Sequence, residues 1–147
     1  MRPFAKVIKA AQEEARRRGD RRISTEHLLL GLLTDEQVAE ALGTDLPAAR
    51  AALDGLDNDA LAAIGLDTTG FEPVAAKHPA VSISRLSTGA RAAVDRCVKA
   101  TSVRTRSWAP AYLLMELLKA EQPDPVAALL AKLDVDRAAV RARLLDG

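Results

Sequence analysis

Two leucine-rich segments with nearly the same pattern constrain the fold of this chain most: ISTEHLLLGLL at residues 23–33 and WAPAYLLMELL at residues 108–118. The two segments lie at a constant offset, so that Ile23 matches Trp108. Their apolar residues predict short helices rather than strands. Helices this short need a partner surface to bury their apolar side chains. A repeated pattern of this kind predicts two tandem copies of one helical unit.

The first half of the chain predicts a row of short helices, each with its own start and stop signals. Apolar residues at helical spacing predict a helix over residues 3–18, which Gly19 ends. Ser24 is expected to cap a second helix that runs to about Leu33. Thr34, which has capping-box spacing with Gln37, is expected to start a third helix that stops near Gly43. Asp45, followed by Pro47, is expected to start a fourth helix through Leu53. A brief helix is expected to start at Asp57 or Asn58.

The second half repeats this order. A helical apolar stripe beginning at Leu86 follows Ser87 and Thr88 as possible caps and matches the opening helix. The segment LGTDLPAARAAL at residues 42–53 aligns with LDVDRAAVRARL at residues 133–144, and Asp124 with Pro125 can start the helix before the second of these. We therefore predict an all-α domain over residues 1–147, with one four-helix repeat at 1–65, a turn-rich connector at 66–85 and a second repeat at 86–147.

Composition and charge narrow the functional classes. A chain of 147 residues that is 48% hydrophobic suits one globular domain. No apolar run is long enough to span a bilayer and the first residues lack the apolar core of a signal peptide, so we expect no membrane partner and a cytoplasmic location. The formal net charge is +1, which gives no overall attraction to nucleic acid. Cys97, the only cysteine, lies on an apolar stripe and is expected to be a buried packing residue.

These motifs resemble a known family. An amphipathic helix with AQEEAR, a short loop, TEHLLLGLL, a short helix and a closing D…R..L helix, all present twice, resemble the Clp N-terminal repeat domain of bacterial Hsp100 unfoldases of the ClpC, ClpA and ClpB type. The resemblance covers nearly the whole chain and is weaker in the second copy, where residues 109–112 read Ala-Pro-Ala-Tyr instead of the usual Gly-Thr-Glu-His type of head. It implies a pseudo-twofold pair of four-helix repeats that receives substrates and adaptor proteins ahead of the ATPase rings.

The resemblance leaves the role of the chain open. No GxxxxGK[ST] loop occurs, so we expect neither ATPase activity nor a nucleotide cofactor. The chain is then either a domain excised from an unfoldase or a stand-alone Clp-repeat protein of the actinobacterial type that its Ala-, Arg- and Leu-rich composition suggests. A stand-alone copy could serve as an adaptor, as a decoy for unfoldase ligands or as a sequestering partner.

Glu26 is the first candidate site residue. In the first turn of its helix it is favoured by the helix dipole, and we expect its free acceptor capacity to face outward, which needs no functional explanation. In ClpC-type domains, however, the equivalent glutamate belongs to a site that recognises phosphorylated arginine through its guanidinium. The resemblance therefore implies arginine-phosphorylated substrates as partners, with a site in one repeat only, because the second-copy position is Ala111.

The resemblance also implies a binding surface near the first helix of each repeat. In the family this surface binds adaptors and, in actinobacterial ClpC proteins, cyclic-peptide antibiotics. The matching residues here are Lys6, Lys9, Gln12 and Glu13 in the first copy and Leu86, Arg91 and Asp95 in the second. The alternative interpretation is that the charged residues form a solvated helix face and that Leu86 belongs to the core.

The remaining motifs favour structural roles. We expect His27 to bond a neighbouring backbone group, and neither it nor His78 has the spacing of a metal site, so no metal is predicted. Ser24, His27 and Asp20 lie close in sequence but lack any nucleophile-elbow pattern, so no catalytic residue is predicted. The alternative function is nucleic-acid binding by the basic run from Arg16 to Arg22, with Arg104 and Arg106 in the matching loop of the second copy.

Overall fold

The computed structural model describes residues 3–65, 79, 81–102 and 105–146, and these residues form an all-helical domain, as the sequence predicts. The described α-helices are α1 (Pro3–Arg18), α2 (Thr25–Leu32), α3 (Glu36–Leu42), α4 (Leu46–Ala63), α5 (Thr88–Ala100), α6 (Ala109–Leu117), α7 (Pro125–Lys132) and α8 (Arg137–Asp146). Two short 3-10 helices, η1 (Ile83–Arg85) and η2 (Arg106–Trp108), precede α5 and α6. None of these helices is both long and apolar enough to cross a membrane.

Most helices begin at the predicted residues, because a side chain near each start accepts a backbone N–H of the first turn. Asp45 accepts the N–H of Ala48, and Asp136, which aligns with it, accepts that of Ala139. Ser87 caps α5 and Asp124 caps α7 in the same way. At the other end of a helix, Gly19 follows α1 with φ 73°, the left-handed conformation that glycine adopts without strain.

Two predicted starts were wrong. Asp35, not Thr34, caps α3, because its carboxylate accepts the N–H groups of Gln37 and Val38, whereas the Thr34 hydroxyl donates back to the Gly31 carbonyl of α2. A second error is the break predicted at residues 57–58, where α4 continues without interruption from Leu46 to Ala63.

Ion pairs with other helices hold the distal part of α4. Arg18, at the end of α1, pairs with Asp54 at 2.9 Å and with Asp57, and Lys132 of α7 pairs with Asp59 at 3.1 Å. Asp57, which was predicted to cap a separate helix, therefore binds a cation of α1 from within α4.

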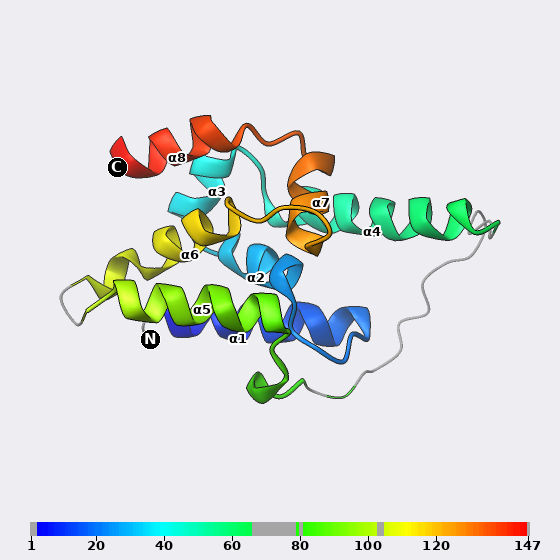
Figure 1. Cartoon of the computed structure of the whole chain (residues 1–147), viewed down its shortest axis with the longest axis horizontal. Coiled ribbons are helices and arrows are strands. Elements are labelled where there is room, and N and C mark those ends of the chain that lie inside the picture. Colours follow the sequence, from blue (N-terminus) through cyan, green and yellow to red (C-terminus); the bar gives the residue numbers. More distant parts are fainter. Residues whose placement is uncertain (1–2, 66–78, 80, 103–104, 147) are drawn as a thin grey trace.

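The helices are arranged in three tiers around α2 and α6 (Figure 1). These two helices carry the leucine-rich segments and lie in the middle of the molecule, with α1 and α5 on one side and α3, α4, α7 and α8 on the other. The largest fully buried side chains include Ile23, Leu28, Leu29, Leu30, Leu32, Leu113, Leu114, Leu117, Leu129 and Leu130. The predicted leucine-rich segments thus supply most of the largest buried side chains of the core.

Contacts between the halves follow a reciprocal pattern. The contact of α1 with α6 has its counterpart in that of α2 with α5, and the contact of α3 with α8 in that of α7 with α4. A pseudo-twofold relation would exchange the members of each pair, but the division into repeats at 1–65 and 86–147 stays a prediction. Much of the predicted connector, residues 66–78 and 80, lies outside the described residues. Its described end bonds the first half, since the N–H of Ile23 donates to the carbonyl of Arg85 at 2.9 Å.

Candidate functional site

The head of α2 is organised by the buried side chain of His27. Its Nδ1 accepts the backbone N–H of Ser24 at 2.9 Å, and its Nε2 lies 2.7 Å from Oδ2 of Asp20. Because Nδ1 accepts a hydrogen bond, the ring proton is on Nε2 and is donated to Asp20. This confirms the predicted structural role of His27 and leaves neither ring nitrogen free to activate the Ser24 hydroxyl.

Asp20 completes this arrangement on the loop between α1 and α2. Burial alone would raise the pKa of Asp20, but the hydrogen bond from His27 and the Arg18 guanidinium outweigh it, so the pKa lies below its ordinary value. The ionised Asp20 therefore fixes both the imidazole ring and the end of α1.

Glu26 differs from its neighbours because one oxygen of its carboxylate has no hydrogen-bond partner among the described residues. Only 13% of its side chain is exposed, so the carboxylate is turned mostly inward rather than outward as expected. Its Oε2 is buried and has no hydrogen-bond partner among the described residues, and Oε1 lies 3.7 Å from Nδ1 of His27. Burial raises the pKa of Glu26 above its ordinary value. A carboxylate held in this state gains most from a ligand that brings a positive charge.

The N-terminal ends of α2, α5 and α7 converge beside Glu26. The Thr25 hydroxyl donates to Oδ1 of Asp124, and the N–H of Val126 lies within 3.3 Å of the same hydroxyl oxygen. A Cβ placed on Gly89 of α5 would lie 3.3 Å from Oδ2 of Asp124 and 3.6 Å from Cγ2 of Thr25. Helix N-termini carry positive partial charge, and at the α7 end the Asp124 carboxylate meets it by accepting the N–H of Val126.

The predicted residues of α1 lie on or near the surface. Lys6 and Lys9 are exposed, and Glu13 pairs with Arg16 at 2.6 Å. The hydrogen bond and charge of Arg16 lower the pKa of Glu13. Gln12 is partly buried and donates to the carbonyl of Val81 at 3.0 Å. Gln12 is thus the α1 residue that a hydrogen bond ties to the segment leading into the second half.

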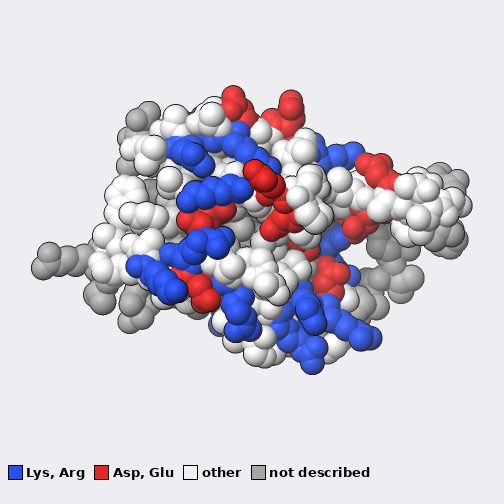
Figure 2. Space-filling model, in the orientation of Figure 1, with Lys and Arg blue, Asp and Glu red and all other residues white. Residues whose placement is uncertain are grey.

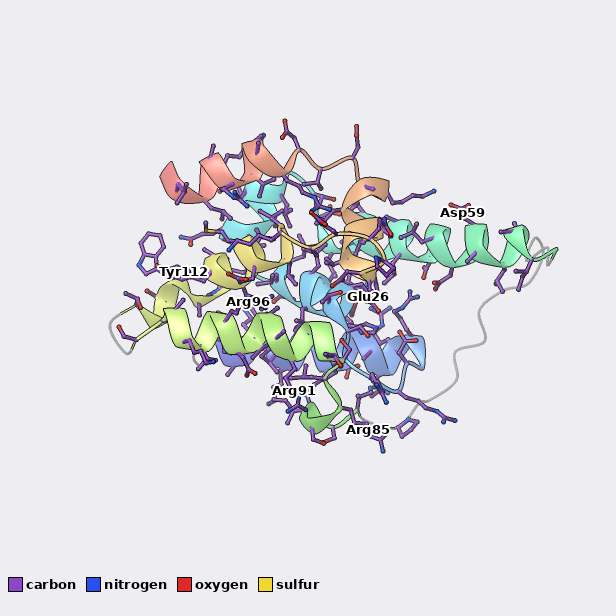
Figure 3. All side chains as sticks on the ribbon, viewed as in Figure 1. Glu26, Asp59, Arg85, Arg91, Arg96 and Tyr112 are labelled. Carbon is purple, nitrogen blue, oxygen red and sulfur yellow. The ribbon has the colours of Figure 1, made fainter. Side chains whose placement is uncertain are left out.

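The predicted residues of α5 differ in exposure. Leu86 is partly buried and packs against the core, while Arg91 and Asp95 are exposed. Arg91 donates to the carbonyl of Ser84 at 3.2 Å. In the view of Figure 3, Glu26 lies above the N-terminal end of α5, and Arg85 and Arg91 lie below that helix. The face of α5 seen in Figure 2 carries several Lys and Arg side chains.

Comparison with known proteins now decides the family. The sequence profile of the Clp repeat (R) N-terminal domain matches residues 2–104, which include α1 to α5. The chain belongs to this family. A search of characterised proteins finds no match. Domains of the family are non-catalytic interaction domains of Clp systems.

In this Clp repeat domain the predicted basic run is mostly paired with acidic side chains. Arg16 pairs with Glu13, Arg17 lies 3.5 Å from Glu14, and Arg18 reaches three aspartates. The remaining two arginines of the run, at 21 and 22, are exposed. Arg104 lies outside the described residues, and the structure describes only the backbone of Arg106. The paired charges reduce the field that would attract phosphates.

Sequence analysis missed the ion pair between Glu14 and Arg50. Glu14 of α1 is 6% exposed and accepts two hydrogen bonds from Arg50 of α4, at 2.6 and 2.8 Å. No signal in the sequence joins these residues, because they lie 36 positions apart on different helices.

The other predicted structural residue is Cys97, which is buried and donates its thiol to the carbonyl of Ala109. Burial, with the charge of Glu116, raises the pKa of Cys97 to about 11. Among the described residues no cluster of His, Cys, Asp and Glu could hold a metal ion, and His78 lies outside them.

Proposed function

We propose that this chain is a non-catalytic protein-interaction module of a Clp unfoldase system that binds segments of substrate or adaptor proteins. The observation that carries the proposal is the family match over residues 2–104. That stretch contains every residue for which the family resemblance implies a binding role.

Glu26 is proposed as the residue that recognises a guanidinium group, and phosphorylated arginine as the ligand class. Three observations support this. Its buried Oε2 lacks a hydrogen-bond donor within the described structure, burial raises its pKa so that a cationic partner would favour the ionised form, and the N-terminal ends of α2 and α5, whose positive partial charge suits a phosphate, meet beside it. A phosphoarginine combines both groups, a cation for Glu26 and an anion for the helix ends.

The surface of α1 and α5 is proposed as the place where adaptors and cyclic peptides bind. Lys6, Lys9 and Glu13 are exposed on α1, and Arg91 and Asp95 on α5. Both helices pack on α2 and α6, so that they flank the same central pair. Gln12 and Leu86 would act at the edge of this surface, because each is partly engaged with the protein itself.

Calorimetric titration with phosphoarginine tests the proposed site. We expect saturable binding that arginine and inorganic phosphate do not reproduce at the same concentrations. Glu26→Gln, which keeps the shape and removes the charge, should weaken binding by at least about tenfold, the usual loss for a charge-assisted hydrogen bond. Glu36→Gln, on an exposed acidic residue of α3, is the matched control and should bind as the wild type does. Equal affinities for the two variants would contradict the proposal.

The cellular role, as adaptor, regulator or decoy, is proposed together with the binding function. An adaptor would speed degradation of an arginine-phosphorylated client by the unfoldase and its peptidase. A decoy would slow the same reaction in proportion to the ligand it removes. A degradation assay with and without the domain distinguishes these roles by the sign of the effect.

A further inference from the structure

A groove lies between α3, the N-terminal end of α6 and α8, and it shares no residue with the proposed Glu26 site. Its volume is about 520 Å³. Apolar side chains of all three helices line it, namely Val38, Ala41, Trp108, Pro110, Ala111 and Leu144. The acidic side chains of Asp35 and Glu40 lie along its α3 edge. The groove therefore combines an apolar floor with a negatively charged edge.

Trp108 is the unusual residue of this groove because 49% of it is exposed. Its counterpart in the aligned first half, Ile23, is fully buried and bonds an extended segment of the chain, accepting the N–H of Ser87 and donating to the carbonyl of Arg85. No described segment covers Trp108 in a comparable way. A large aromatic side chain left half exposed beside a groove is typical of a binding surface.

The way α3 and α7 meet their neighbours explains why only one of two similar junctions is open. On the α7 side, the Thr25 hydroxyl is bonded to Asp124, which caps α7. On the α3 side, the residue aligned with Thr25 is Pro110, which has no side-chain donor, while Asp35 caps α3. The hydrogen bond that closes the first junction therefore has no counterpart at the second.

The charges in the groove select the kind of partner. Arg143 of α8 also lines the groove, but its Nη1 donates to the Ala41 carbonyl at 2.7 Å. This carbonyl lies at the C-terminal end of α3, where the helix dipole favours a cation. Glu40 is exposed and forms no ion pair with any described residue. Trp108 and Glu40 line the same groove, and an arginine suits both, because a guanidinium can stack on an indole ring and pair with a carboxylate.

We propose that this groove binds an extended peptide segment of a partner protein in which an unmodified arginine alternates with apolar residues. The arginine stacks on Trp108 and pairs with Glu40, and an apolar neighbour packs on Val38 and Leu144. The site differs from the Glu26 site in requiring no phosphate.

Intrinsic fluorescence tests this directly, because Trp108 is the only tryptophan of the chain. The probe is an acetylated and amidated octapeptide of alternating leucine and arginine, and the comparison peptides replace arginine with citrulline, its uncharged isostere, or with glutamate. We expect the arginine peptide to shift the emission of Trp108 saturably and the other two to bind at least about tenfold more weakly. An equal response to all three peptides, or none to the arginine peptide, would overturn the proposal.

Two acidic residues of α3 provide matched variants. Glu40→Gln removes the carboxylate at the groove and should weaken binding of the arginine peptide by about two- to fivefold, the upper part of the range for an exposed charge pair. Glu36→Gln removes an exposed carboxylate outside the groove and should leave the affinity unchanged. Glu26→Gln should also leave it unchanged, which separates this site from the proposed phosphoarginine site. Equal effects of Glu40→Gln and Glu36→Gln would show that the peptide senses only the net charge of the domain, and would refute the assignment.

Discussion

Replacing Gly31 with alanine sets two physical effects against each other. Glycine in a helix costs roughly 0.5–1 kcal/mol relative to alanine, so helix propensity alone predicts a more stable protein. In the structure, however, a Cβ on Gly31 would lie 2.5 Å from the Val7 carbonyl oxygen and 2.9 Å from the Ala11 amide nitrogen. Both atoms belong to the backbone of α1, so no side-chain rotation can relieve the contact.

The cost follows from what must move. Overpacking a core by one methyl group costs about 1–3 kcal/mol, and the upper end applies here because α1 has to shift as a unit on α2. After subtracting the propensity gain, we expect Gly31→Ala to lower the free energy of unfolding by about 2 kcal/mol. This is a large part of the roughly 5–15 kcal/mol of a typical domain. Urea denaturation followed by far-UV circular dichroism measures it.

Gly55 supplies the matched control, since it also lies within a helix but faces a flexible partner. A Cβ there would lie 3.2 Å from Cε of Lys132, near the end of a side chain that can move. Gly55→Ala should therefore gain about 0.5 kcal/mol from helix propensity. If Gly31→Ala is as stable as the wild type, the close approach of α1 to α2 does not exist in solution and the packing argument fails.

Three further predictions follow from the same structure. Glu26→Gln should raise the free energy of unfolding at neutral pH by about 1 kcal/mol, because Oε2 of the carboxylate is buried without a hydrogen-bond donor. The gain should vanish well below pH 4.5, the ordinary pKa, where Glu26 is protonated in the folded and unfolded states alike. Urea titrations at both pH values measure the gain, and a gain that persists at the lower pH would contradict the prediction. Arg50→Met should lower the free energy of unfolding by about 2 kcal/mol, less than the loss of a fully buried pair, because Arg50 is 36% exposed and Arg17 also lies near Glu14. Adding Glu14→Leu should recover most of this loss in a double-mutant cycle, and a cycle without coupling would refute the pairing. Gly43→Ala should lower the free energy of unfolding by about 1 kcal/mol through the φ of 73° alone, since no atom lies within 4 Å of the added Cβ. The melting temperature should fall by a few degrees, and an unchanged melting temperature would argue against the left-handed cap.

The sequence predicts helix starts well where the controlling interaction is local. Asp45 and Ser87 accept an N–H three residues ahead, so the signal and the structure it sets lie in the same turn. The start of α3 was misplaced because Thr34 and Asp35 are both good caps and adjacent. The continuity of α4 was missed because the partner of Asp57, Arg18, lies 39 residues away on another helix.

The candidate site shows the same limit. The structural role of His27 was predictable because its backbone partner, Ser24, lies three residues away. The inward position of Glu26 was not, since the surroundings of this helix end include residues distant in sequence, such as Asp124, which bonds Thr25 across 99 residues. The groove at Trp108 likewise depends on which of two similar helix junctions is closed by a hydrogen bond, which only the packed structure reveals.

Affinity capture tests most directly whether this chain is an interaction module of a Clp system. The immobilised wild-type domain, Glu26→Ala and an unrelated helical domain of similar size are incubated with lysate of the source organism, and retained proteins are identified by mass spectrometry. We predict that Clp unfoldase subunits or arginine-phosphorylated proteins are enriched on the wild-type domain, and that the phosphorylated ones are lost with Glu26→Ala. Enrichment of neither class over the unrelated domain would contradict the proposed function.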